Sequence, residues 1–311
     1  MGAPFFHSPV QDLVDHKIAA AYNEAGEQYL AYADGAAGDL FAFDGDYAYG
    51  DRESWALLVA KLKALRAAGR TELGLLDLGC GPGTWIRRLV IEARRLGFSR
   101  VRARGIDLAE GQIAHARKSC SALARLPGVT LHFEPGDIRA PFSEKDGSVD
   151  LCLCLYGVLN HLSVRDMGAV LREAARVTGG WFIATVRATG STPTIYVDSL
   201  QAARGFRQDN HFDRMDVELA NGRHISFASH LFSSAELRDL ASGAFAIEDL
   251  RGLDLFHLRF ALDARFNPTE RVRADGLLPE LDRLEEACCR HPGMIDFATH
   301  LLLVAKPRTE G

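Results

Sequence analysis

Glycines and a carboxylate gather at the end of the first apolar run in this sequence. The run reads Leu75-Leu76-Asp77-Leu78-Gly79-Cys80-Gly81-Pro82-Gly83. Glycine adopts positive φ angles without strain and lets a ligand approach the backbone, and the helix predicted to follow presents free N–H groups at its start. We therefore expect this turn to bind a ligand that carries a ribose or an anionic group.

The position of Asp77 narrows the choice of ligand. A glycine-rich turn also holds the pyrophosphate of dinucleotides in NAD(P)-dependent oxidoreductases, but a carboxylate two residues before Gly79 would repel a pyrophosphate. The same carboxylate attracts the ammonium and sulfonium groups of S-adenosylmethionine. Gly83 also comes one residue too early for the dinucleotide pattern. The turn favours S-adenosylmethionine, and an NAD(P)-dependent oxidoreductase remains an alternative.

Two further carboxylates follow the next two predicted strands. Asp107 ends the strand Val101–Asp107, where it can accept hydrogen bonds from both hydroxyls of a ribose. Asp137 follows the strand Val129–Glu134, and it can accept from the exocyclic amine of an adenine, with the Ile138 amide nearby. An isolated aspartate there would be read as an ordinary turn residue. Together with the glycine-rich turn after Asp77 and with Asp107, however, Asp137 indicates an adenosine site.

These blocks, in this order and spacing, resemble the class I S-adenosylmethionine-dependent methyltransferases over about residues 73–187 and the closing strands. The resemblance implies that Asp77, Gly79, Gly81 and Gly83 surround the methionine moiety, that Asp107 and Leu108 bind the ribose, and that Asp137 and Ile138 bind the adenine. We also assign Cys80 and Leu155 to the cofactor site. A protein that binds S-adenosylmethionine without catalysis is a second alternative, because fold fixes a cofactor better than a reaction.

The fourth predicted strand, Val149–Leu155, leads into a loop with three polar side chains, Tyr156, Asn160 and His161. Ligands bind at the carboxyl ends of strands in open α/β sheets, so Tyr156 and Asn160 are candidate substrate-binding residues. His161 is the candidate catalytic residue, because a hydroxyl acceptor must lose a proton whereas an amine need only arrive neutral. The competing interpretation is a histidine that is hydrogen-bonded beneath the loop.

Residues 1–70 are expected to form a helical cap, with helices at about 10–33 and at Ser54–Ala68. The cap is similar to that of small-molecule methyltransferases, in which an aromatic residue reaches the cofactor. Tyr22, Tyr29 and Tyr32 offer such rings, and we assign Tyr29 to the cofactor and Tyr32 to the substrate. Motifs of DNA-amino, cytosine-C5 and protein-arginine methyltransferases are missing. The expected acceptor is therefore a small molecule.

The alternation of strands and helices over residues 71–311 predicts an α/β fold, in which crossover helices connect the strands of a parallel sheet. The resemblance implies that this sheet is Rossmann-like, seven-stranded and mixed. The resemblance implies that the last strand is antiparallel, and Phe245–Leu250 followed by Asp296–Lys306 fits that hairpin. Insertions are expected after strands 5 and 6, at about 188–232 and 252–296. Both lie on the substrate side.

Composition restricts the partners. A formal net charge of -5 disfavours a nucleic acid or an anionic membrane as partner. Arginines do cluster after residue 86, and the first four, at 87, 88, 94 and 95, have the spacing of a solvated helix face. Six cysteines without a Cys-x-x-Cys pair indicate reduced thiols.

The N-terminal residues do not resemble a secretory leader, so we expect a cytoplasmic protein. Histidines and aspartates between 211 and 230 lack the spacing of a metal site, and we expect no metal. The sequence leaves the oligomeric state open.

Overall fold

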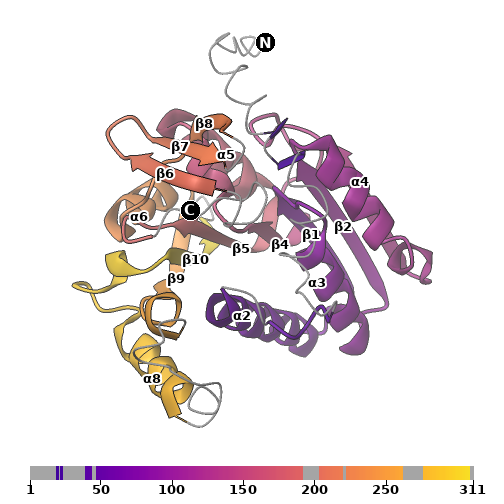
Figure 1. Cartoon of the computed structure of the whole chain (residues 1–311). Helices are drawn as coiled ribbons and strands as arrows, with labels where there is room; N and C mark the ends of the chain where they lie inside the picture. Colours follow the sequence, from indigo (N-terminus) through magenta and orange to yellow (C-terminus); the bar gives the residue numbers. More distant parts are fainter. Residues whose placement is uncertain are drawn as a thin grey trace.

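The computed structural model describes residues 19–20, 22–23, 39–43, 47–191, 203–219, 222–261 and 276–308. Its centre is a seven-stranded sheet with the order β3-β2-β1-β4-β5-β10-β9 (Figure 1). The strands are β1 (Glu72–Leu78), β2 (Arg100–Asp107), β3 (Val129–Pro135), β4 (Val149–Cys154), β5 (Thr178–Arg187), β9 (Phe245–Leu253) and β10 (His300–Pro307). The pairs among β1 to β5 are parallel, and β10 is antiparallel to both β5 and β9. The predicted mixed sheet is confirmed.

Helices cover both faces of the sheet. On one face lie α2 (Ala48–Ala67), α3 (Thr84–Arg95) and α4 (Glu110–Ser119), and on the other lie α5 (Val164–Val177) and α6 (Ser234–Ser242). β4 is buried along its whole length, because each face meets a helical layer. Its alternate residues enter the two cores, with Leu151 in one and Cys152 in the other. The switch from β1 to β4 across the sheet leaves a crevice at the carboxyl ends of the strands.

The two predicted insertions contain regular elements, of which the sequence indicates one, a helix near Leu278–Cys289. Within 188–232 the chain forms β6 (Ala203–Asp209), β7 (Arg214–Leu219) and β8 (His224–Ala228), which pair as a separate antiparallel sheet. Within 252–296 it forms a π-helical turn at His257–Ala261, α8 (Leu278–Cys288) and a 3-10 turn at Ile295–Phe297. The β6–β8 sheet lies near α5 and α6, beside the sheet edge at which β4 and β5 end (Figure 1).

Two details of the helices differ from expectation. α2 begins at Ala48, six residues before the predicted Ser54, because its first turn packs through Tyr49 and Gly50 rather than through the later leucine stripe. Arg88 of α3 does not belong to a solvated face, since its side chain is 3% exposed. Its Nε donates to the Leu40 carbonyl at 2.7 Å, and its guanidinium lies over the Phe43 and Trp85 rings. Within the described ranges, no helix is both long enough and apolar enough to cross a bilayer.

Candidate functional site

A cavity opens at the carboxyl ends of β1, β2, β3 and β4 and encloses an empty volume of about 780 Å³, part of which is open to solvent. Five segments of the chain line this cavity. They contribute glycine backbone, carboxylates, apolar side chains and aromatic rings. The lining residues are Ala19, Tyr22, Gly79, Gly81, Asp107, Leu108, Ala109, Gln112, Gly136, Asp137, Ile138, Arg139, Leu155, Tyr156, Val158, His161 and Leu162.

The glycine turn after β1 folds back onto β2. Gly79 and Cys80 donate their N–H groups to the Ile106 carbonyl at 2.8 and 3.0 Å. Gly79 has φ +73°, and a Cβ at this residue would lie 2.3 Å from Cγ2 of Val158. Only glycine meets both demands, the left-handed backbone and the close approach of the next wall residue. The turn therefore presents backbone rather than side chains to the cavity.

Asp107 joins the first two strand ends. Its Oδ2 accepts from Gly81 N at 2.9 Å and its Oδ1 accepts from Ala109 N at 2.8 Å. Burial raises the pKa of Asp107, although these two N–H bonds oppose the change. Each carboxylate oxygen can accept more than one hydrogen bond, so both keep capacity for a ligand. This arrangement suits a ligand with two adjacent hydroxyl groups.

Asp77 and Cys80 lie behind the cavity wall. Asp77 is 3% exposed, and burial, with the nearby Asp107 adding to it, raises the pKa of Asp77 to about 7. Cys80 belongs to the core cluster between the sheet and α3, and its Sγ lies against Gly105. Gly83, also off the wall, starts α3 in a left-handed conformation. These three predicted cofactor residues shape the turn from behind, and their direct contact with a cofactor stays a prediction.

Asp137 and Ile138 form the opposite wall. The Nε of Arg139 donates to both carboxylate oxygens of Asp137 at 2.9 and 2.8 Å, and Arg139 N donates to Oδ1 at 2.9 Å. Ile138 is 7% exposed and packs into the core below. The carboxylate is thus held in one orientation beside the cavity.

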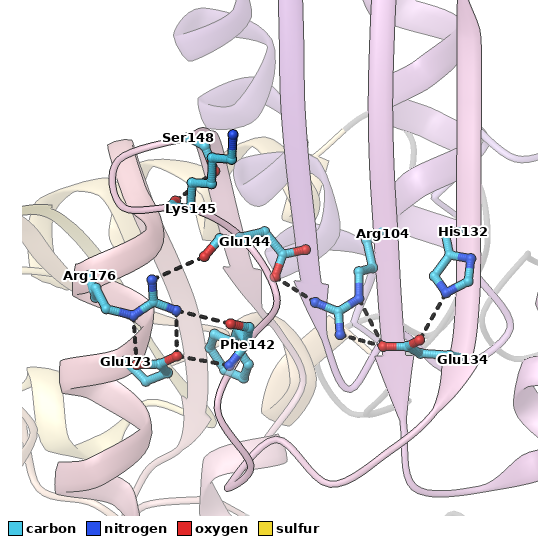
Figure 2. A network of polar contacts seen from close by, with 9 residues as sticks. All are labelled: Arg104, His132, Glu134, Phe142, Glu144, Lys145, Ser148, Glu173 and Arg176. Carbon is cyan, nitrogen blue, oxygen red and sulfur yellow. Dashed lines mark hydrogen bonds and ion pairs between the residues drawn. The ribbon is translucent and has the colours of Figure 1, made fainter. Parts of the chain in front are cut away.

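A polar network anchors the chain that follows this wall (Figure 2). Arg104 of β2 binds Glu134 of β3 and Glu144, while Arg176 of α5 donates to the carbonyls of Phe142 and Glu144 at 3.0 Å. Both arginines are more than half-buried, so the pairs are less screened by solvent than open surface pairs. The network fixes the segment 142–148 between β2 and α5.

His161 has a defined tautomer in this structure. Its Nδ1 lies 2.7 Å from the Ala228 carbonyl, which can only accept, so Nδ1 carries the proton. The Nε2 atom lies 3.2 Å from the hydroxyl of Tyr22 and acts as acceptor. Burial lowers the pKa of His161, with Arg187 adding to the effect. The lowered pKa favours the neutral imidazole, in which the lone pair lies on Nε2, and the His161 side chain lines the cavity.

Tyr156 is the other unusual residue of this loop. It has φ +59°, a left-handed conformation that is uncommon outside glycine, and its N–H donates to Oγ1 of Thr185 at 2.6 Å. Its ring stacks at 6.0 Å on Trp85 and meets the edge of His300 at 6.1 Å. Strained backbone of this kind collects at functional sites.

Asn160 does not line the cavity. It is 1% exposed, its Nδ2 donates to the carbonyls of Arg187 and His230, and its Oδ1 accepts from Arg187 N at 2.9 Å. The amide is occupied by backbone groups of the protein itself. This geometry favours a role in fixing the loop over the predicted contact with substrate.

The described part of the N-terminal segment docks on α4. Oδ1 of Asn23 accepts from Gly111 N at 2.9 Å, and Nε2 of Gln112 donates to the Tyr22 carbonyl at 2.9 Å. Asn23 thus satisfies a free N–H in the first turn of α4, where helix ends lack internal partners. Tyr29 and Tyr32, the predicted aromatic contacts, lie outside the described residues.

The sequence reasoning missed several wall residues. Ala109 and Gln112 follow Asp107 in the chain, and Arg139 and Val158 flank predicted residues. Their proximity to the predicted positions was the available signal. The pairing of Tyr22 with His161 joins residues 139 positions apart, which no local pattern could reveal.

Comparisons with known proteins agree with this geometry. Residues 75–180 match a family described as "Methyltransferase domain". A comparison of the sequence with curated proteins finds no match. The fold is similar to that of magnesium protoporphyrin IX methyltransferase from Synechocystis PCC 6803, solved with S-adenosylmethionine bound, at 15% identity and TM-score 0.52, covering 99% of this chain and 100% of that one. It is also similar to a SAM-dependent methyltransferase from Methanosarcina mazei, at 15% identity and TM-score 0.51, covering 78% and 95%.

Proposed function

We propose that this chain, which contains a methyltransferase domain on the fold of S-adenosylmethionine-dependent methyltransferases, transfers a methyl group from S-adenosylmethionine to an oxygen or nitrogen atom of a small molecule. The observation that carries the proposal is the neutral His161, whose Nε2 lone pair lies on the wall of the cavity that also contains Asp107 and the glycine turn. Methyl transfer from a sulfonium is an in-line displacement. The protein mainly has to align the acceptor and exclude water.

The wall residues fit the cofactor. Asp107 and Leu108 would bind the ribose, the apolar side chain of Ile138 would pack against the adenine, and Asp137 would accept from the amine of the adenine. The backbone of the turn at Gly79 and Gly81 would face the methionine moiety. Asp77 lies close behind, next to Asp107, where burial raises its pKa to about 7, and a cationic ligand would favour the ionised form of this carboxyl group. When bound, the cofactor supplies an activated methyl group.

His161 would act on the acceptor. With Nδ1–H held by Ala228, a proton from an acceptor hydroxyl would go to Nε2, which the hydroxyl of Tyr22 occupies in this structure. The acceptor would therefore take the place of the Tyr22 hydroxyl. Tyr156, with its strained backbone, would form the side of the acceptor site towards His300.

Several features support a small acceptor and a cytoplasmic location. The cavity is walled on several sides, as suits a compact ligand better than a polymer. The net charge of -5 disfavours a nucleic acid or an anionic membrane as the partner. All six cysteines are free, as expected in a reducing compartment. Residues 1–70 would serve as the cap of this site, and 71–311 as the methyltransferase domain.

A calorimetric titration tests the cofactor assignment against the oxidoreductase alternative. S-adenosylmethionine and S-adenosylhomocysteine should bind with one site per chain, and NAD⁺ and NADP⁺ should produce no heat of binding at the same concentrations. Saturable binding of either dinucleotide, without binding of S-adenosylhomocysteine, would overturn the proposal.

The substitution Gly79→Ala should abolish cofactor binding at concentrations that saturate the native protein. The new Cβ would lie 2.3 Å from Val158, and the residue would need φ near +73°. Either the turn or the Val158 wall must move, and both line the cavity. The double variant Gly79→Ala/Val158→Ala should recover part of the affinity, because the smaller side chain removes the overlap. If the single variant binds S-adenosylhomocysteine normally, the turn is not the methionine site.

Ligand binding should slow hydrogen exchange in the docked N-terminal segment. Ala19 and Tyr22 line the cavity, and Asn23 caps α4, so a ligand that fills the cavity stabilises their contacts. Amides of residues 19–23 and the Gly111 amide should exchange several-fold more slowly with S-adenosylhomocysteine present. Asn23→Ala should reduce this protection. Equal exchange with and without ligand would argue against a cap that closes on the cofactor.

A further inference from the structure

The segment Ala228–His230, between β8 and α6, touches the candidate base and its neighbour in the loop after β4. The Ala228 carbonyl accepts from Nδ1 of His161 at 2.7 Å. Two residues later, His230 N donates to the Asn160 carbonyl at 2.8 Å, and the His230 carbonyl accepts from Nδ2 of Asn160. The tautomer of His161 therefore depends on where this segment lies.

The side chain of His230 fixes the segment from the other side. Nδ1 of His230 lies 2.7 Å from Oδ1 of Asp213, and its Nε2 lies 2.9 Å from Oε1 of Glu236. Asp213 belongs to the turn between β7 and β6, and Glu236 to the first turn of α6. Both ring nitrogens face carboxylates, which only accept, so the geometry is that of an imidazolium with two charge-assisted hydrogen bonds. We call these three residues the His230 clamp.

The histidine of the clamp is largely buried, whereas its two carboxylates are more exposed. The His230 side chain is 15% exposed, and its ring meets the Phe232 ring edge-on at 4.6 Å. Burial lowers the pKa of His230, but the bonds to Asp213 and Glu236 outweigh this effect and raise it above its usual range. Asp213 has φ +48° and its carbonyl accepts from Ser229 N at 2.8 Å. The turn of the inserted sheet thus holds the segment by both its backbone and its carboxylate.

We propose that the His230 clamp is a positioning device for His161, through which the inserted β6–β8 sheet and α6 hold the Ala228 carbonyl against Nδ1 and keep the lone pair on Nε2. His230 itself lines no part of the cavity, and it acts only through the segment Ala228–His230. The effect on turnover rests on the proposed role of His161 as base. The effect on the tautomer of His161 does not.

The ring ¹⁵N shifts of His161 test the clamp without any acceptor. In the native protein Nδ1 should be protonated and Nε2 unprotonated. In His230→Ala the Ala228 carbonyl loses the support of the His230 side chain and keeps only the backbone contacts of the segment, so the ¹⁵N shifts should move toward a mixture of the two tautomers. Glu236→Gln replaces the carboxylate with an uncharged amide of similar size. This variant should shift the tautomer in the same direction but by a smaller amount. Asp239→Asn changes an exposed acid on the same helix and should change nothing.

Turnover provides the second readout once a methyl acceptor has been found. His230→Ala should lower kcat about tenfold and leave the Kd of S-adenosylhomocysteine within about twofold, as a positioning residue would. In a His161→Ala background the same change should have no further effect on kcat, because the two residues act as one unit. Far-ultraviolet circular dichroism and Tm establish whether each variant is folded. If His230→Ala does not fold, Glu236→Gln replaces it in these measurements.

The outcomes separate the two proposals. If the tautomer of His161 is unchanged in folded His230→Ala and Glu236→Gln, the proposed positioning role of the clamp is wrong. This holds even if the His161→Ala variant has a low kcat. A shifted tautomer in a protein whose His161→Ala variant turns over normally would support the clamp and overturn the role of His161 as base.

Discussion

Asp107→Ala should weaken the binding of S-adenosylhomocysteine by about a hundredfold. Two charge-assisted hydrogen bonds to a ribose are worth roughly 3 kcal/mol together, which corresponds to a little more than a hundredfold in Kd. The carboxylate also accepts from Gly81 N and Ala109 N, so its removal releases the turn after β1 and the loop after β2. Calorimetry or competition with a fluorescent analogue measures the change in affinity.

Two variants control for indirect effects. Asp107→Asn keeps the size of the side chain and one acceptor oxygen, and it should lose less affinity than Asp107→Ala. Glu110→Ala removes an exposed acid three residues away and should bind normally. If Asp107→Ala folds with near-native Tm and keeps its affinity, the cofactor does not bind in the cavity described above.

His161→Ala should lower kcat by a hundredfold or more if the acceptor is a hydroxyl, with the affinity for S-adenosylhomocysteine unchanged. General-base catalysis contributes roughly 10²–10⁴-fold, and the Nε2 lone pair lies on the cavity wall while Nδ1–H is bound to Ala228. If the acceptor is an amine, the same variant should mainly raise KM, because no strong base is needed. The exposed His224 on β8 gives the matched control, His224→Ala, with normal kinetics.

The pH profile identifies the base independently. His161 works as base only when neutral, and burial lowers its pKa below the usual histidine value of about 6.5. kcat should therefore be level at neutral pH and fall about tenfold per pH unit below the lowered pKa. This acid limb should disappear in His161→Ala. A limb that persists in the variant, or native turnover in it, would assign the proton transfer to another group.

The sheet and the cofactor wall follow from local patterns. Short apolar runs such as Val149–Cys154 alternate with amphipathic segments such as Val164–Val177, and this alternation defines parallel strands and crossover helices. The glycines near 79–83 and the aspartates at 107 and 137 mark strand ends by their own chemistry. Nine of the residues predicted from the sequence line the same cavity: Gly79, Gly81, Asp107, Leu108, Asp137, Ile138, Leu155, Tyr156 and His161.

Tertiary contacts explain what the sequence could not reveal. Nothing near Asn160 indicates that its amide binds the backbone at Arg187 and His230, because those partners lie in other parts of the chain. The orientation of Cys80 toward Gly105 depends on the register of β1 and β2. The sequence does not predict the inserted β6–β8 sheet, because its strands carry many charged residues and lack a continuous apolar run.

The most direct test follows a methyl label. The purified protein is incubated with S-adenosylmethionine labelled in its methyl group and with the small-molecule fraction of a cell extract, alongside Asp107→Ala and a parallel incubation with the protein and nucleic-acid fraction. Labelled product and S-adenosylhomocysteine should form in equal amounts from the small-molecule fraction, and product formation should fall sharply in Asp107→Ala at subsaturating cofactor. Label that enters only the macromolecular fraction, or binding of S-adenosylmethionine without transfer to either fraction, would contradict the account.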